Sequence, residues 1–234
     1  MPGAVIIGAG PGIGQAVARR FARAGVPVGL VARGDGTVKA AVEAVRQAAI
    51  GGTAVAGRTA DSTDETSLRA ALDGVAQELG PPDVLVYNAA LIRPDAVGEL
   101  SVREHLDAWA VNVVGALTAA AHVAPGMAAR GHGTVLVTGG MPEPKPEYVS
   151  LSLGKAGVRT LVTLLDQTYG GSGVHAASVT VAGPVAPGTA FDPDVIAEHY
   201  WRLHAQPRDA WEHEVVHGGR RHLREVNSPC GSDN

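Results

Sequence analysis

The chain has 234 residues, of which 45% are hydrophobic and 18% are charged, so it holds enough apolar material for the core of one α/β domain. Its net charge is −4 and no basic run is longer than Arg220-Arg221, which argues against a nucleic-acid partner, and no apolar run reaches the roughly 18 residues of a membrane span. The single cysteine, Cys230, lies in a polar segment and cannot form an internal disulfide, so we expect a cytoplasmic protein without nucleic-acid or membrane partners.

Glycines crowd the segment 8–14, directly after an apolar run and directly before a helical pattern. A strand that turns sharply into a helix needs small residues there, so that the backbone can approach a ligand closely. The helix N-terminus then offers free N–H groups and the positive end of its dipole to a pyrophosphate. The spacing is not the strict Gly-x-Gly-x-x-Gly, because Ile13 stands where the last glycine would be. We expect a dinucleotide-binding loop, with an ordinary turn as the alternative.

Apolar runs and helical patterns alternate along the chain. The runs predict strands at 4–7, 26–31, 53–56, 83–87, 134–138, 174–181 and 214–216, and helical spacing falls at 13–24, 37–49, 65–79, 101–129, 148–170 and 193–204. This alternation predicts one Rossmann-type, doubly wound parallel sheet of about seven strands with helices on both faces, over residues 1–216. Residues 217–234 are polar, and we expect them to form a mobile tail.

Short motifs follow one another in a fixed order, and together they resemble the short-chain dehydrogenase/reductase family to about residue 216. The spelling Gly-x-x-x-Gly-x-Gly resembles the family's cofactor loop, here made of Gly8, Gly10, Pro11, Gly12, Ile13 and Gly14. Asp61, after the third predicted strand, resembles the acid that contacts the adenine. Asn88, in Asn88-Ala89-Ala90, resembles part of the Asn-Asn-Ala-Gly turn that steadies the sheet beside the cofactor, although two of its four letters differ.

Three further signals lie in the second half of the chain. Asn112 resembles the helix asparagine that supports a proton-relay water, with a solvent-facing helix residue as the alternative. Lys155, followed by Ala-Gly-Val, resembles the active-site lysine that holds the nicotinamide ribose, with a surface lysine as the alternative. Pro184 and Thr189 match the spacing of the family's Pro-Gly-x-x-x-Thr turn beside the carboxamide, with Val185 in place of the glycine.

The preference between the two nicotinamide cofactors depends on the residues after the second predicted strand. A carboxylate there hydrogen-bonds the ribose hydroxyls of NAD and repels a 2′-phosphate. This chain has Ala32 and Arg33 instead, and a guanidinium pairs with a phosphate and stacks on adenine. We therefore expect NADP(H) to be favoured over NAD(H). The alternative is a solvated Arg33 with Asp35 as a displaced acid.

The resemblance fails at the usual proton donor. Relatives that reduce ketones use a tyrosine four residues before the lysine as general acid, and a serine at the end of strand five to hold the substrate oxygen. Those positions are Leu151 and Gly140 here. The nearest phenol, Tyr148, precedes the lysine by seven residues, which returns to the same helix face within about 20° and about 10 Å along the axis. We predict Tyr148 as a relocated acid; a helix-start residue that packs on a neighbour is the alternative.

Other polar side chains near this region are weaker candidates. The hydroxyls of Ser152 and Thr138 are candidates to orient a substrate oxygen, and local hydrogen bonding is the alternative. His199 and His204 are second choices for the acid. No His-Glu-x-x-His motif occurs, and His213 and His217 lie in or beside a predicted strand, where this spacing does not bring ligands together, so we expect no metal site.

Four aromatic residues gather within the segment 191–211: Phe191, Tyr200, Trp201 and Trp211. In the resembled family the segment after strand six forms a lid, so we expect 191–211 on the substrate side, with a subunit contact or simple core as the alternative. The long predicted helices 101–129 and 148–170 resemble those that pair in relatives, which implies a homodimer or homotetramer.

The resemblance implies an NADP(H)-dependent oxidoreductase that transfers hydride to a small ketone, imine or activated alkene with a relocated proton donor. An imine or an enone needs less help from an acid than a simple ketone does. Because both usual hydroxyl groups are missing, a protein of this fold with a non-redox role is the alternative: a cyclase, a dehydratase or a dinucleotide-binding regulator.

Overall fold

The protein is built on one parallel sheet. The computed structural model describes residues 3–218 and places seven strands in the order β3-β2-β1-β4-β5-β6-β7. These are β1 (Gly3–Ile7), β2 (Val28–Ala32), β3 (Val55–Thr59), β4 (Pro82–Tyr87), β5 (Gly133–Gly140), β6 (Val174–Val181) and β7 (Glu214–His217). The predicted doubly wound Rossmann-type fold is therefore confirmed. The strand order reverses between β1 and β4, which is where ligands bind in such sheets.

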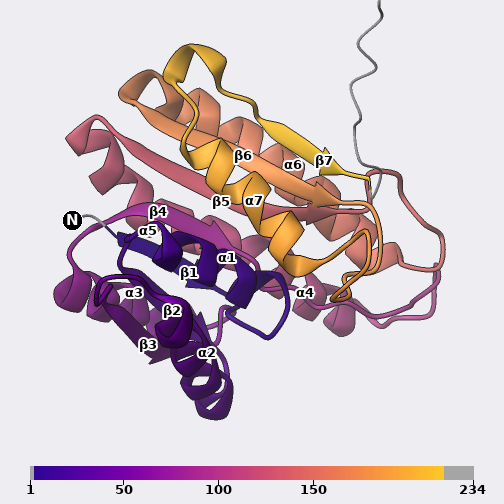
Figure 1. Ribbon diagram of the computed structural model, residues 1–234. Coiled ribbons are helices and arrows are strands. Elements are labelled where there is room, and N and C mark those ends of the chain that lie inside the picture. The colour runs from indigo at the N-terminus through magenta and orange to yellow at the C-terminus, as the bar shows by residue number, and fades with distance from the viewer. Residues whose placement is uncertain (1–2, 219–234) are drawn as a thin grey trace, which may run out of the picture.

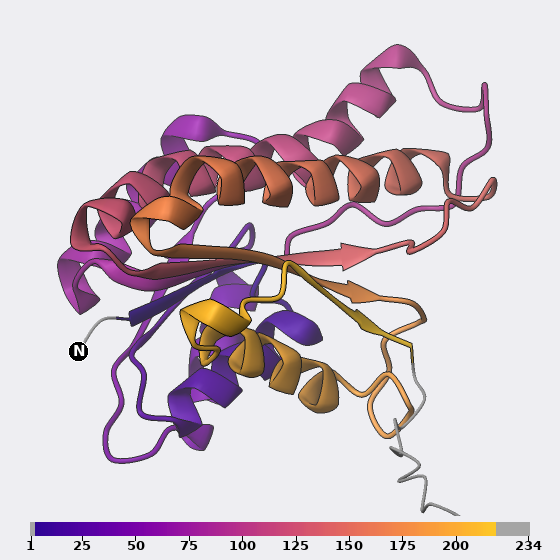
Figure 2. The same cartoon turned by 90° about the horizontal axis from the view of Figure 1, so that it is seen from above.

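Helices cover both faces of the sheet (Figure 1). One face carries α1 (Ile13–Arg23), α2 (Asp35–Ala48) and α7 (Pro193–His204), and the other carries α3 (Glu65–Leu79), α5 (Gly115–Arg130) and α6 (Val149–Tyr169), as the view from above shows (Figure 2). The remaining elements are α4 (Val102–Trp109), a π-helical segment η1 (Ala110–Val114) and two 3-10 turns, η2 (Gly170–Ser172) and η3 (Arg208–Ala210). Each face of the sheet thus has its own apolar core.

The burial of the strands explains the apolar runs. Every residue of β1, β2 and β6 is buried, as in central parallel strands that are covered on both faces. β7 alternates exposed and buried residues, as an edge strand does. It continues to His217, so the predicted tail starts one residue too early; from residue 219 onward that segment lies outside the described residues.

The predicted helix 101–129 is a continuous helical run whose hydrogen bonding changes inside it. Ser101 and Glu104 form a capping box at its start. The run Val102–Arg130 has 29 residues and a mean hydropathy of 1.3 in its most apolar part, so by length and composition alone it is able to cross a membrane. Polar residues such as Asn112 and His122 interrupt it, so it is not the continuous apolar run of about 18 residues that was expected to be absent. Alanine and valine raise the average without forming one uninterrupted apolar run. Buried residues such as Ala119 and Val123 pack this helix on the sheet.

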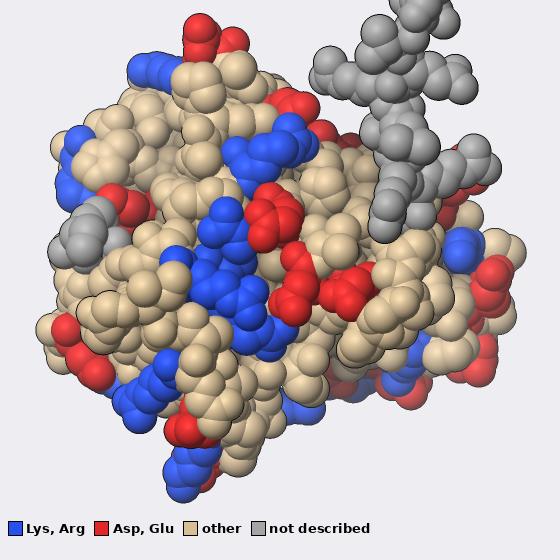
Figure 3. Space-filling view, in the orientation of Figure 1, with Lys and Arg blue, Asp and Glu red and all other residues tan. Residues whose placement is uncertain are grey.

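Helix α7 is fastened to α1 by ion pairs as well as by apolar contact. Arg19 pairs with Asp194 at 2.6 Å, and Arg20 pairs with Glu198 at 2.7 Å. The space-filling view of this side shows basic and acidic side chains next to one another rather than a surface of one sign (Figure 3). Helix α7 is therefore part of the folded layer on the α1 face.

Candidate active site

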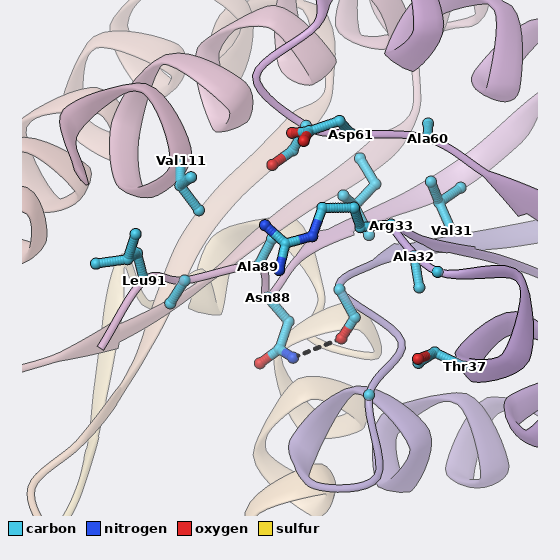
Figure 4. A pocket seen from close by; sticks show the side chains of 16 residues that line it. Val31, Ala32, Arg33, Thr37, Ala60, Asp61, Asn88, Ala89, Leu91 and Val111 are labelled. Atoms are coloured by element: carbon cyan, nitrogen blue, oxygen red, sulfur yellow. Dashed lines mark hydrogen bonds between the residues drawn. The ribbon is translucent and has the colours of Figure 1, made fainter. Parts of the chain in front are cut away.

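A cavity of about 510 Å³ opens at the carboxyl ends of β1, β2, β3 and β4, beside the switch point. Its wall is formed by the loops that follow β1, β2, β3 and β4, with Val111 of η1 on the far side (Figure 4). Residues predicted to bind the cofactor line it from all four loops: Gly8, Gly10, Arg33, Asp61 and Asn88. The structure therefore brings these five residues to one cavity together with Thr37, which the sequence did not indicate; their contact with a cofactor stays a prediction.

The glycines of the loop serve different purposes. Gly8 has a φ of +86°, and a Cβ there would lie 2.4 Å from the backbone nitrogen of Ala89. A Cβ on Gly14 would lie 2.2 Å from the carbonyl oxygen of Gly8. Around Gly10 nothing lies within 4 Å of such a Cβ, so the space beside it is open to the cavity. No side chain caps α1 at Gly12, which leaves the N-terminus of this helix available to an anion.

Arg33 and Asp61 project into the cavity from neighbouring strand ends (Figure 4). The carboxylate of Asp61 accepts hydrogen bonds from the backbone N–H and the hydroxyl of Thr63, and these bonds, with the charge of Arg33, lower the pKa of Asp61. Within residues 3–218, Arg33 forms no ion pair or hydrogen bond with another residue. Asp35 pairs with Lys39 and does not line the cavity. The guanidinium is thus the strand-two group that faces a ligand.

A chain of hydrogen bonds runs beneath the glycine loop. The side-chain amide of Asn88 donates to the carbonyl of Gly8 at 2.8 Å, as the dashed line in Figure 4 marks. The Asn88 carbonyl oxygen accepts from the hydroxyl of Thr138 at 2.8 Å. That hydroxyl also contacts the hydroxyl of Tyr200 at 2.6 Å. Three distant parts of the chain, β4, β5 and α7, therefore meet behind the cavity.

Lys155 belongs to α6, and its buried ammonium lies near the carboxyl end of β5 without lining the cavity. Its ammonium group donates to the backbone carbonyl of Thr138 at 2.7 Å. Burial, and then the nearby charge of Arg159, lower the pKa of Lys155 to about 8. Arg159, one helical turn further along α6, donates to the carbonyls of Gly140 and Met141 and so fixes the end of this strand. The role of Arg159, which follows the lysine by four residues on the same helix, was not recognised from the sequence.

The comparison with protein families now identifies the chain. A family model described as short chain dehydrogenase matches residues 3–193. The chain belongs to the short chain dehydrogenase family.

One relative with a similar sequence and two proteins with a similar structure are informative. A cis-4-hydroxycyclohexanecarboxylate dehydrogenase of Sinomonas cyclohexanicum is 36% identical over 197 residues, which are 81% of this chain and 74% of that protein. An alcohol dehydrogenase of Thermococcus sibiricus, solved with 5-hydroxy-NADP, is 26% identical with a TM-score of 0.82 and coverage of 92% and 95%. A Pseudomonas aeruginosa PAO1 short chain oxidoreductase, solved with NADPH and described as having an atypical catalytic center, is 22% identical with a TM-score of 0.84 and coverage of 94% and 97%.

Gly140 and Leu151, which the resemblance matches to the family's serine and tyrosine, carry no hydroxyl. Gly140 lies against the lysine, because a Cβ there would be 3.6 Å from Cε of Lys155. Leu151 is buried in α6. Tyr148 is the half-buried N-cap residue of α6, one residue before the helix begins, and its backbone forms a parallel bridge with Asp95. Its role as the acid stays a prediction.

The hydroxyls of Ser152 and Thr138 are both engaged inside the protein. Ser152 accepts from the backbone N–H of Lys145 at 3.0 Å and donates to its carbonyl at 3.4 Å, which fastens the proline-rich loop to α6. Thr138 contacts Asn88 and Tyr200 instead of facing outward. Local hydrogen bonding thus describes Ser152, whereas the partners of Thr138 come from distant parts of the chain; a substrate contact of either hydroxyl stays a prediction.

Asn112 lies in the π-helical segment and is buried. Its side chain accepts from the N–H of Leu91 at 2.8 Å and donates to the carbonyl of Leu91 at 3.2 Å. The solvent-facing alternative is thus wrong, because this amide binds the loop after β4. In the π-helical segment, the backbone carbonyl of Val111 accepts a hydrogen bond from the hydroxyl of Tyr87 at 2.5 Å. π-helical turns are frequent at functional sites, and no sequence pattern signalled this one.

The loop after β6 carries Pro184 and Thr189, which are exposed and do not line the cavity. The hydroxyl of Thr189 donates to the carbonyl of Ala186 at 2.7 Å and so shapes the loop itself. Their contact with a carboxamide stays a prediction.

The two histidines considered as acids lie in different places. His199 contacts His217 at 3.0 Å, and His217 in turn contacts the carbonyl of Ala190 in the loop after β6. His204 contacts the hydroxyl of Thr134 near the amino end of β5, whereas the glycine loop lies at the carboxyl ends of the strands. His204 is therefore too far along the strand to act in the cavity, which corrects that candidate. Residues 3–218 contain no group of three or more side chains arranged to hold a metal ion.

One of the four aromatic residues of 191–211 is buried, and the other three are half-buried. Tyr200 is fully buried, and Trp201 packs edge-on against Phe21 of α1 with ring centres 5.3 Å apart. Trp211 stacks on His175. The core alternative describes these residues, since they fasten α7 and the following turn to the sheet; a lid function for the remainder of the segment stays a prediction.

Proposed function

We propose that this short chain dehydrogenase is an NADP(H)-dependent reductase that transfers hydride to a small ketone, imine or activated alkene. The observation that carries the proposal is the position of Arg33. Its guanidinium projects into the cavity from the end of β2 and, among the described residues, has no internal partner. A 2′-phosphate supplies the acceptor that this group lacks.

The other residues of the cavity fit the rest of the dinucleotide. Gly10 and the uncapped N-terminus of α1 would receive the pyrophosphate, because no side chain occupies that space. Asp61, kept ionised by its bonds to Thr63, would accept from the adenine. The complexes of the Thermococcus and Pseudomonas proteins with NADP-type ligands support the same choice of cofactor.

When bound, the nicotinamide supplies the hydride. Lys155 would hold the ribose, and its buried ammonium favours the negative charge that develops on a reduced oxygen or carbon. The proton has two candidate sources: the phenol of Tyr148, or Lys155 itself, whose pKa of about 8 allows it to give up a proton near neutral pH. The atypical catalytic center of the Pseudomonas protein is a precedent within the same fold.

Stopped-flow measurement of NADPH absorbance with three carbonyl-type compounds tests this proposal. Suitable compounds are 4-oxocyclohexanecarboxylate, which is the ketone related to the Sinomonas enzyme's alcohol, a cyclic imine and a cyclic enone. We expect oxidation of NADPH with at least one of them, and slower oxidation in Tyr148→Phe if the phenol is the donor. Unchanged turnover in Tyr148→Phe would remove the phenol from the mechanism.

The second candidate is a non-redox role for the same dinucleotide site. It is favoured by Gly140 and Leu151, together with the internal engagement of Ser152 and Thr138. Tight binding of NADPH without oxidation by any of the three compounds would support this role over reduction.

A further inference from the structure

The hydroxyl of Tyr200 does not line the cavity, yet it is linked to the glycine loop. Tyr200 belongs to α7 and is fully buried, and its hydroxyl is 2.6 Å from that of Thr138. Thr138 contacts Asn88, and Asn88 contacts Gly8, at 2.8 Å each. The path from α7 to the cavity therefore consists of three consecutive short hydrogen bonds.

The direction of each bond follows from the donors available. The carbonyl of Gly8 only accepts, so the Asn88 side chain presents its NH₂ to it and its oxygen to Thr138. Thr138 donates its single hydroxyl proton to the side-chain oxygen of Asn88, so in the bond between Tyr200 and Thr138 the phenol must be the donor. Burial raises the pKa of Tyr200, which keeps this proton in place. All donors thus point toward the loop.

The path ends at a tightly packed peptide of the loop. Gly8 has a positive φ and packs directly on Ala89, and its carbonyl is also the atom that a Cβ on Gly14 would strike. Moving this peptide moves the N-terminus of α1 with it. We propose that Tyr200 is a positioning residue of the dinucleotide site, whose hydroxyl orients Thr138 and Asn88 and thereby fixes the Gly8 peptide; its effect on affinity rests on the proposed function.

If the Tyr200 hydroxyl only stabilised the fold, its removal would lower the melting temperature without changing the glycine loop. Thr134 offers a matched control for that role. Thr134 lies on the same strand, four residues earlier, and is also buried. Its hydroxyl contacts Nδ1 of His204 on the same helix, at 3.0 Å. This bond joins β5 to α7 as well, but it lies at the amino end of the strand and is not connected to the loop.

The experiment compares Tyr200→Phe, Thr138→Val, Thr138→Ser and Thr134→Val in the full-length protein. The dissociation constant of NADPH is measured by fluorescence titration, and hydrogen exchange of residues 8–14 is measured without ligand. We expect Tyr200→Phe and Thr138→Val to weaken NADPH binding about 3- to 10-fold and to speed exchange in the loop. Thr138→Ser recovers most of the affinity, and Thr134→Val lowers the melting temperature without changing affinity or loop exchange. The double variant Tyr200→Phe/Thr138→Val binds NADPH as Thr138→Val does.

Equal effects of Tyr200→Phe and Thr134→Val, or unchanged affinity and exchange in Tyr200→Phe, would overturn the inference. If the wild-type protein binds neither NADPH nor NADH, the proposed function fails, but loop exchange still decides the inference. Faster exchange in Tyr200→Phe than in Thr134→Val supports it, and equal exchange contradicts it.

Discussion

At the scale of single residues, the buried charge of Lys155 is a cost to the folded state. Its ammonium is buried and has one hydrogen bond, to a backbone carbonyl, and no carboxylate partner among the described residues. Its pKa falls from 10.5 to about 8. The charged form is therefore disfavoured in the folded state by at most about 3 kcal/mol at neutral pH. Such a penalty is retained when the charge serves a ligand.

Replacing this lysine is expected to stabilise the ligand-free protein. Lys155→Met removes the buried charge but also leaves the Thr138 carbonyl without its donor, so we expect a net gain of roughly 1–2 kcal/mol at pH 7, a rise of several degrees in melting temperature. NADPH binding weakens. Because the folded pKa lies below the unfolded one, wild-type stability rises between pH 8 and 10.5, and the difference from the variant shrinks over that range.

The control for this prediction is Lys39→Met, since Lys39 is 76% exposed and paired only with Asp35. It should change the melting temperature and NADPH affinity little. A lower melting temperature in Lys155→Met than in wild type at pH 7 would show that the ammonium stabilises the ligand-free fold, contrary to our account.

At the scale of elements, the π-helical segment is positioned by its contact with Tyr87 and by the absence of a side chain at Gly115. A Cβ on Gly115 would lie 2.3 Å from the hydroxyl oxygen of Tyr87 and 2.7 Å from the carbonyl oxygen of Ser62. The Tyr87 hydroxyl in turn donates to the π-helix carbonyl of Val111, and burial raises its pKa to about 12. The segment that presents Asn112 is therefore positioned by contacts with β4 and with the loop after β3.

This packing predicts a second-site rescue. Gly115→Ala should destabilise the protein by about 1–3 kcal/mol in urea unfolding, because the new methyl group meets the phenol. Tyr87→Phe removes the oxygen that would lie 2.3 Å from the new methyl group. The double variant should therefore lose less unfolding free energy than the two single variants lose together. Strict additivity would mean that the methyl group is accommodated in another way.

The elements that the sequence predicted are those with a local signal. Apolar runs and helical spacing located every strand, and most helix ends to within about one residue. The glycine cluster, the residue after strand two and the family resemblance pointed to Gly8, Arg33, Asp61 and Asn88, and all four line the cavity. The π-helix was missed because 101–129 has an ordinary helical pattern throughout.

The internal roles of polar residues were missed for a different reason. Thr138 meets Asn88 and Tyr200, which are 50 and 62 positions away along the chain, and only tertiary packing brings them together. A hydroxyl near the active-site lysine looks like a substrate contact until its buried partners are known.

At the scale of the whole molecule, α4, α5 and α6 leave large apolar side chains exposed on the face away from the sheet. Leu106, Leu117 and Leu153 are 59%, 48% and 56% exposed, and Trp109 is 42% exposed. Apolar groups gathered on one face of a molecule mark an interaction surface. We propose that a second copy of this chain covers them, which gives at least a homodimer.

Sedimentation equilibrium checks this assembly. We expect the wild-type protein to be dimeric or tetrameric at micromolar concentration, and Leu153→Glu to shift it toward the monomer, because the carboxylate would be buried in the interface. Ile50→Glu, at a position 61% exposed between α2 and β3, should leave the assembly unchanged. A monomeric wild-type protein would contradict the proposed interface.

We propose that Arg33 gives the cavity its preference for NADP(H), and parallel titrations with NADPH and NADH test this most directly. We expect wild-type protein to bind NADPH about 10-fold or more tightly than NADH, since the guanidinium forms charge-assisted bonds with the 2′-phosphate. Arg33→Ala should lose most of that preference while binding NADH nearly as before. Equal dissociation constants for the two cofactors, or tighter binding of NADH by the wild-type protein, would contradict the account.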